Sequence, residues 1–176
     1  MTKNRDFKSL KVLIVSAKPH VAQILRQVLG IAGVGEIVTA ADGSAAIEFL
    51  SNQIFDAVFC DDASASDTGS DFGAASRKSE GVLDPMLPVF LVCAGPRRRD
   101  VETARDQGYT DVLTRPVSAA TIMRKLTLAV ERPRPFIVAP DFYGPDRRAE
   151  SRGQFRGNER RKRIPRKVKI PAAVEV

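Results

Sequence analysis

The sequence is poor in the residues that build disulfide or metal frameworks. Its 176 residues include two cysteines, Cys60 and Cys93, and a single histidine, His20. The cysteines lack the CxxC spacing of a zinc site and are too few for a disulfide framework. We therefore expect them to be small buried side chains in a reducing compartment. No histidine is available to either as a base, which argues against thiol catalysis.

Long apolar runs are also missing. The longest, such as Val12–Val15, fall far short of the roughly 20 residues that a membrane helix needs. Residues 1–8 are polar and lead into a strand-like segment, without the apolar stretch of a secretory signal. We expect a cytoplasmic protein that inserts into no membrane. Gly30, Gly33 and Gly35 follow a helical segment and precede a strand, the reverse of the order in a dinucleotide-binding fingerprint. We therefore predict no cofactor. We also predict that the protein is not an enzyme.

Positive charge is concentrated at one end of the chain. Residues 1–131 hold 15 Lys and Arg against 16 Asp and Glu, whereas residues 132–176 hold 13 against 5. The net charge of +7 therefore comes from the last quarter of the sequence. A basic extension on a neutral domain favours an anionic partner for the extension alone.

Short apolar runs alternate with helical periodicity from Lys11 to Glu131. Strands are predicted at residues 11–15, 36–39, 55–60, 88–93 and 110–113. Helices are predicted from Pro19, from a cap at Asp42, over 98–107 and from about Ser118, with a weaker one at 72–78. The first helix places Val21, Ile24, Leu25, Val28 and Leu29 on one face, and the last Ile122, Met123, Leu126, Ala129 and Val130. This alternation predicts an α/β fold with a parallel sheet covered on both faces.

Two segments depart from this rhythm. Residues 61–87 begin with a polar, acidic loop at the carboxyl end of the third strand, where open α/β sheets place their sites. After Glu131 several prolines prevent a continuing helix. We therefore predict one domain over residues 9–131 and an extended Arg, Pro and Gly-rich tail over residues 132–176. Within the tail, the pattern of Phe142–Arg148 is repeated in Phe155–Arg161: each has an aromatic residue, a glycine, an acidic residue and an arginine pair. This repeat suggests a duplicated binding element.

Several motifs, in order, resemble one known family over about 120 residues of the chain. They are Lys11–Val15 (KVLIV), Pro19-His20, Ala40–Gly43 (AADG), Phe55–Asp61 (FDAVFCD), Pro88–Ala94 (PVFLVCA) and Leu113–Val117 (LTRPV). Together they are similar to the CheY-like receiver domain of two-component response regulators. The resemblance implies a flavodoxin-like sheet of five parallel strands in the order 2-1-3-4-5 with five helices.

The resemblance also implies a phosphoryl-transfer site, and most of its positions are altered here. The phosphoacceptor position falls on Asp61, which is retained. The acidic pair that holds Mg²⁺ falls on Ser16 and Ala17, with Lys18 next to them. The phosphoryl-reading hydroxyl falls on Cys93, the lysine on Arg115 and the aromatic switch residue on Val112.

These changes argue against phosphorylation of Asp61. Serine and alanine cannot replace two carboxylates around a hard cation, so no metal site is predicted. Losing the metal removes several kcal/mol of transition-state stabilisation. A metal site rebuilt from Asp62 and Asp67 would keep a conventional phosphorylated regulator possible, and we retain that alternative.

The tail interleaves aromatic and basic side chains, a combination that stacks bases and pairs phosphates. The candidate binding residues are Phe142, Tyr143, Phe155, Arg147, Arg148, Arg160 and Arg161. Three interpretations remain open: a solvated segment, a docking segment for a protein partner or the receiver's own acidic face, and a site for cyclic di-GMP or nucleic acid. The cyclic di-GMP alternative follows from resemblance to CheY-like proteins with arginine-rich extensions.

The sequence as a whole therefore predicts a non-catalytic, stand-alone signalling receiver that acts through protein–protein contact, independently of phosphorylation. An effector that binds an anionic ligand through the tail is the main rival.

Overall fold

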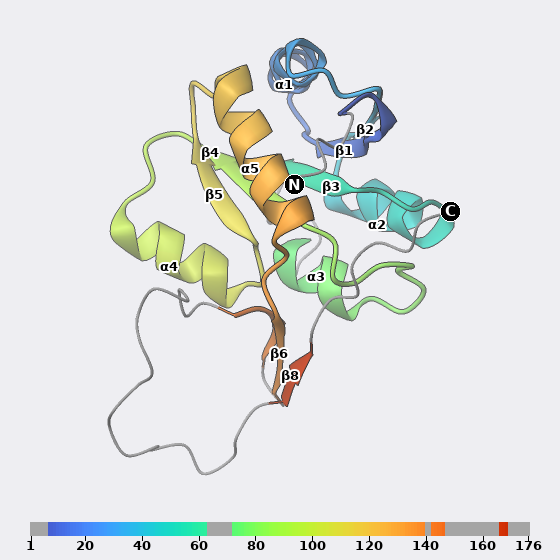
Figure 1. Ribbon diagram of the computed structural model, residues 1–176, viewed down its shortest axis with the longest axis vertical. Helices are drawn as coiled ribbons and strands as arrows, with labels where there is room; N and C mark the ends of the chain where they lie inside the picture. Colours follow the sequence, from blue (N-terminus) through green and yellow to red (C-terminus); the bar gives the residue numbers. More distant parts are fainter. Residues whose placement is uncertain (1–6, 63–71, 140–141, 147–165, 169–176) are drawn as a thin grey trace.

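Figure 1 shows the computed structural model, which describes residues 7–62, 72–139, 142–146 and 166–168. A short 3-10 turn, Phe7–Ser9, precedes the first strand. The main strands are β1 (Lys11–Val15), β2 (Glu36–Ala40), β3 (Ala57–Asp61), β4 (Val89–Cys93) and β5 (Asp111–Thr114). The helices are α1 (Pro19–Ile31), α2 (Gly43–Asn52), α3 (Phe72–Lys78), α4 (Arg98–Asp106) and α5 (Ala119–Glu131). Three further strands follow: β6 (Phe136–Ala139), β7 (Phe142–Pro145) and β8 (Arg166–Val168).

The central sheet has the predicted flavodoxin-like topology. Its five strands are parallel and lie in the order β2-β1-β3-β4-β5. Alternate residues of each strand point to opposite faces, so Val12 and Ile14 pack with the α1 and α5 side, whereas Leu13 and Val15 pack with α2 and α3. The carboxyl ends of all five strands therefore meet at one edge, and that edge carries Asp61.

Local signals in the sequence place the helix ends. The Asp42 carboxylate accepts a hydrogen bond from the Ala45 amide at 2.8 Å and caps α2, as predicted. Ser118 caps α5 in the same way through the Thr121 amide, at 3.2 Å. No helix in the described parts of the chain is both long and apolar enough to cross a membrane.

Two residues of the predicted helix stripes are exposed. Ile24 is 55% exposed and Met123 is 39% exposed. The sheet contacts a narrower stripe on each helix, centred on Leu25 and Leu29 in α1 and on Ile122 and Leu126 in α5. Ile24 and Met123 lie at the borders of those stripes, so the helix faces that contact the sheet are narrower than the periodicity predicts.

A second, small sheet follows α5, where the sequence predicted an extended tail. The antiparallel strands lie in the order β7-β6-β8, and Phe136 pairs with both Pro145 and Val168. In Figure 1 this sheet lies below the main body, next to α3. Part of the tail thus belongs to the folded structure.

Candidate functional site

The carboxyl edge of the sheet brings together the residues that follow β1, β3, β4 and β5. Asp61 ends β3 and is fully buried. Ser16, directly after β1, is also buried, and its hydroxyl donates to Asp61 Oδ2 at 3.5 Å. The same hydroxyl accepts from the Lys18 amide at 3.2 Å, so Ser16 shapes the turn into α1. Ala17 contributes a methyl group and no oxygen ligand from its side chain.

Arg115 bridges two neighbouring carboxylates at this edge. Its Nη1 lies 3.2 Å from Asp61 Oδ1, and its Nη2 lies 2.9 Å from Asp62 Oδ1. The bridging side chain is 28% exposed, whereas Asp61 is fully enclosed. Asp62, which the sequence offered as a replacement metal ligand, is therefore paired with a guanidinium.

The environment of Asp61 disfavours its charged form overall. Burial raises the pKa of the Asp61 carboxyl above its ordinary value, and the neighbouring Asp62 acts in the same direction. The positive charges of Arg115 and Lys18 oppose this pKa shift without cancelling it. The site therefore holds a carboxylate that depends on its arginine for stabilisation.

Cys93 ends β4 next to this cluster. Its side chain is 7% exposed, and its Sγ lies 3.9 Å from the Leu113 carbonyl. Burial, followed by the nearby Asp62 charge, raises the pKa of the Cys93 thiol. A thiol held in its neutral form is a weak nucleophile and a weak hydrogen-bond donor.

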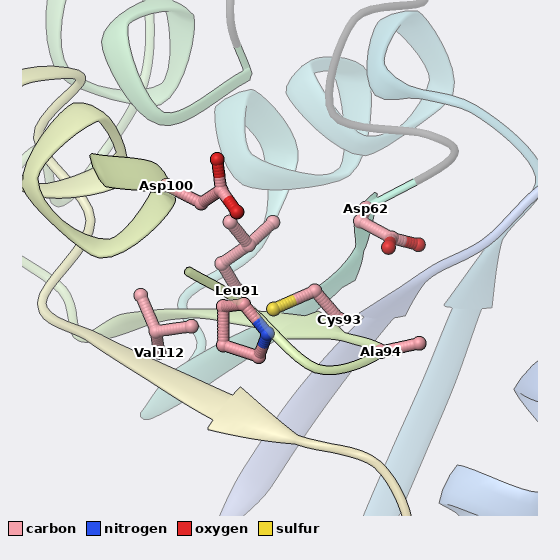
Figure 2. Close-up of a pocket in the computed structure, with 7 residues that line it drawn as sticks. Asp62, Leu91, Cys93, Ala94, Asp100 and Val112 are labelled. Carbon is pink, nitrogen blue, oxygen red and sulfur yellow. The ribbon is translucent and has the colours of Figure 1, made fainter. Parts of the chain in front are cut away.

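A pocket of about 200 Å³ lies beside Cys93, between the carboxyl end of β4 and the start of α4. Its lining residues are Asp62, Leu91, Cys93, Ala94, Pro96, Asp100 and Val112. Figure 2 shows Leu91, Cys93 and Val112 grouped around it, with Asp62 and Asp100 on opposite sides. Val112 is half-buried, so the position assigned to an aromatic residue by resemblance is filled by a small aliphatic one.

The residues at this edge do not fit a divalent cation. The two carboxylates here already share the guanidinium of Arg115, and the turn after β1 offers Ser16 and Ala17. Within the described residues, no group of three or more His, Cys, Asp or Glu side chains could hold a metal ion. Asp67, the other proposed replacement ligand, lies outside those residues. The arrangement supports ion pairing in place of metal binding.

The tail candidates lie away from this edge. Phe142 and Tyr143 belong to β7, and the Tyr143 ring lies 5.7 Å from that of Phe136. Arg147, Arg148, Phe155, Arg160 and Arg161 lie outside the described residues.

One buried charge, Arg77, was not predictable from the sequence. Arg77, on the weakly helical α3, is 4% exposed and donates hydrogen bonds to three backbone carbonyls. No periodicity or motif distinguishes it from a surface arginine, because its partners are backbone carbonyls of loops that lie 8 to 31 positions further along the chain.

Comparison with known proteins agrees with this fold. The sequence profile of the response regulator receiver domain matches residues 12–127. Chemotaxis protein CheY-3 of Vibrio cholerae is 29% identical over 125 residues, covering 71% of this chain and 95% of the relative.

Solved structures show the same fold. Chemotaxis response regulator CheY4 of Vibrio cholerae is 26% identical, with a TM-score of 0.57 over 66% of this chain and 95% of that one. The receiver domain of a sensor histidine kinase from Pseudomonas aeruginosa PAO1, solved with a magnesium ion coordinated in its active site cleft, is 22% identical. Its TM-score is 0.56, over 66% of this chain and 93% of that one.

Proposed function

The chain belongs to the response regulator receiver domain family of two-component signalling, and from this premise we propose that it signals without phosphorylation. In this proposal it is a non-enzymatic cytoplasmic receiver that acts by contact with protein partners. No cofactor takes part.

The observation that carries the proposal is the bridge from Arg115 to Asp61 and Asp62. The guanidinium neutralises the acceptor carboxylate from within the chain, at 3.2 Å and 2.9 Å from the two acids. Phosphoryl transfer needs charge stabilisation around the transferred group, and a metal ion usually supplies several kcal/mol of it. To attack a phosphoryl group, the Asp61 carboxylate would have to give up its ion pair with Arg115, and no metal ion would replace that stabilisation.

The partner surface is proposed on α4, β5 and α5. In a phosphorylated receiver this face changes with the site, but Val112 supplies no aromatic ring that could rotate. The α4, β5 and α5 surface would then keep one conformation, which binds partners at all times. Substituting Asp61 with Asn should leave partner affinity unchanged, as measured by calorimetry once a partner is in hand, whereas a tenfold change would contradict this role.

Incubation with Mg²⁺ and acetyl phosphate tests the proposal directly. Intact-mass spectrometry of the full chain should find no acid-labile adduct of one phosphoryl group. The matched control is the triple variant S16D/A17D/R115K, which restores the receiver pattern at these positions and should gain label. Robust label on wild-type Asp61 would overturn the proposal and favour a conventional phosphorylated regulator.

A second candidate function is binding of an anionic ligand, cyclic di-GMP or nucleic acid, through the Arg-rich tail. One observation favours it: β8 pairs with β6, so residues 147–165 join two strands of the same small sheet. Those residues carry eight Lys and Arg against two Asp and Glu.

Binding through the tail should weaken steeply with salt, because each phosphate contact releases a counterion. We would titrate the full chain with cyclic di-GMP and with RNA at two salt concentrations. The variant R147A/R148A/R160A/R161A should lose that binding and its salt dependence. Equal binding by the variant would exclude this function for the arginine pairs.

A further inference from the structure

Arg77 holds two loops together at the edge of the sheet opposite Asp61. Its Nη1 donates to the Pro85 and Leu87 carbonyls at 2.8 and 2.6 Å. Its Nε and Nη2 donate to the Gly108 carbonyl at 3.3 and 3.1 Å. Pro85 and Leu87 precede β4, and Gly108 precedes β5. One buried guanidinium thus fixes the entries to two neighbouring strands.

The antiparallel pair β6 and β7 covers this guanidinium; we call residues 136–139 and 142–146 the strap. The buried Phe136 ring has its centroid 5.2 Å from Arg77 Cζ, within the range of a cation–π contact. The strap also approaches the loop backbone closely, because a Cβ atom on Gly144 would lie 3.1 Å from Gly108 Cα. Burial lowers the pKa of Arg77 to about 10, so the group stays charged at neutral pH.

Buried contacts connect the strap region to Asp61. Tyr109 follows Gly108 and is 2% exposed. A Cβ atom on Gly73 of α3 would lie 2.6 Å from its ring, so α3 and Tyr109 pack without a gap. The Tyr109 hydroxyl donates to Cys60 Sγ at 4.0 Å, and Cys60 is the residue before Asp61.

We propose that the strap is a conformational device that controls the Asp61 site from the opposite edge of the sheet. In the docked state, Phe136 and Arg77 hold α3 and Tyr109 against β3. When a partner of the C-terminal sheet draws the strap away, the Arg77 contacts loosen and the carboxyl end of β3 becomes more mobile. In this proposal the docked strap and the withdrawn strap are the two states that such coupling requires. The device operates whether or not Asp61 accepts phosphate.

Hydrogen exchange of the full chain tests the coupling. The variant F136L keeps an apolar side chain but removes the ring over Arg77. Exchange should rise about tenfold in the strap, in α3 and at residues 59–61 of β3. The control V138A changes a 37% exposed residue of the same strand and should leave β3 unchanged.

A second readout separates coupling from general loosening. The carbon NMR titration of the Asp61 carboxyl should shift toward its ordinary range in F136L and stay in place in V138A. R77K, which keeps the charge but loses the planar fork, provides an independent probe with the same expected pattern. Faster exchange confined to the strap and β8, with β3 and the Asp61 titration unchanged, would overturn the proposal.

Discussion

At the scale of single residues, the difference between an arginine and a lysine decides what the site can hold. A guanidinium is a planar fork whose two nitrogens can bind separate acceptors, whereas an ammonium is a compact point charge. Arg115 uses this geometry to contact Asp61 and Asp62 together. The sequence placed Asp61, Ser16, Cys93 and Arg115 at one edge through family resemblance. The pairing with Asp62 was not predictable, because it depends on the side-chain path of a residue 53 positions away.

Replacing Asp61 with Asn should stabilise the protein at neutral pH. The pKa of Asp61 in the folded state lies above its ordinary value of 3.8, so the folded state holds its proton to higher pH than the unfolded chain does. Wild-type stability therefore falls as pH rises through that interval. Urea unfolding from pH 8 down to pH 4 should show a D61N advantage that shrinks as the pH drops. An advantage that grows at lower pH would contradict the sign of this shift.

Replacing Arg115 with Met should destabilise the protein by about 2 kcal/mol at pH 7, because it leaves Asp61 buried without its cation. Adding D61N should recover most of this loss, since the amide needs no counter-charge. The double-mutant cycle is measured by urea unfolding of the four proteins. Additive effects would show that Arg115 does not stabilise the Asp61 charge.

At the scale of elements, the strands and helices of the receiver fold were predictable and the strap was not. Alternating apolar runs and caps such as Asp42 carry strong local signals, and each of the five main strands lies within two residues of its prediction. The strap contains Gly144 and Pro145, residues typical of loops. Its strands depend on packing against Gly108 and Arg77, which no local pattern reveals.

Replacing Gly108 with Ala should weaken the attachment of the strap. Gly108 has φ +88°, and an added Cβ would lie 3.3 Å from Arg77 Cγ and 3.4 Å from the Tyr143 carbonyl oxygen. We expect a loss of about 2 kcal/mol, which combines backbone strain with displaced neighbours. Gly95, at φ +56° with open space around it, provides the control for strain alone. Equal losses of unfolding free energy in G108A and G95A would show that the close approach is unimportant.

At the scale of the whole molecule, the charge division of the sequence does not coincide with a structural division. The basic quarter begins at residue 132, yet Phe136 is only 2% exposed, with its ring against Arg77, and Asp146 is only 8% exposed. The folded unit therefore extends beyond α5. Composition places a boundary at residue 132 because the strap is buried through only a few side chains and through backbone contact, which hardly change the composition of residues 132–176.

Truncation after Arg132 should destabilise the receiver by about 3 kcal/mol, because it removes Phe136 from Arg77. Truncation after Val168 retains the described strands and should change the free energy of unfolding by less than about 0.5 kcal/mol. Thermal and urea unfolding of both truncations check this. If the shorter chain is as stable as the full one, the strap is an independent appendage. Ligand experiments on the tail are therefore better done with arginine substitutions than with deletion.

A magnesium titration followed by amide NMR tests whether an internal arginine has taken the place of a divalent ion beside Asp61. We expect the amides of Ser16, Asp61 and Asp62 to keep their chemical shifts through millimolar Mg²⁺, while S16D/A17D/R115K shows saturable changes at the same amides. Saturable magnesium-dependent shifts at these positions in the wild-type protein would contradict this expectation.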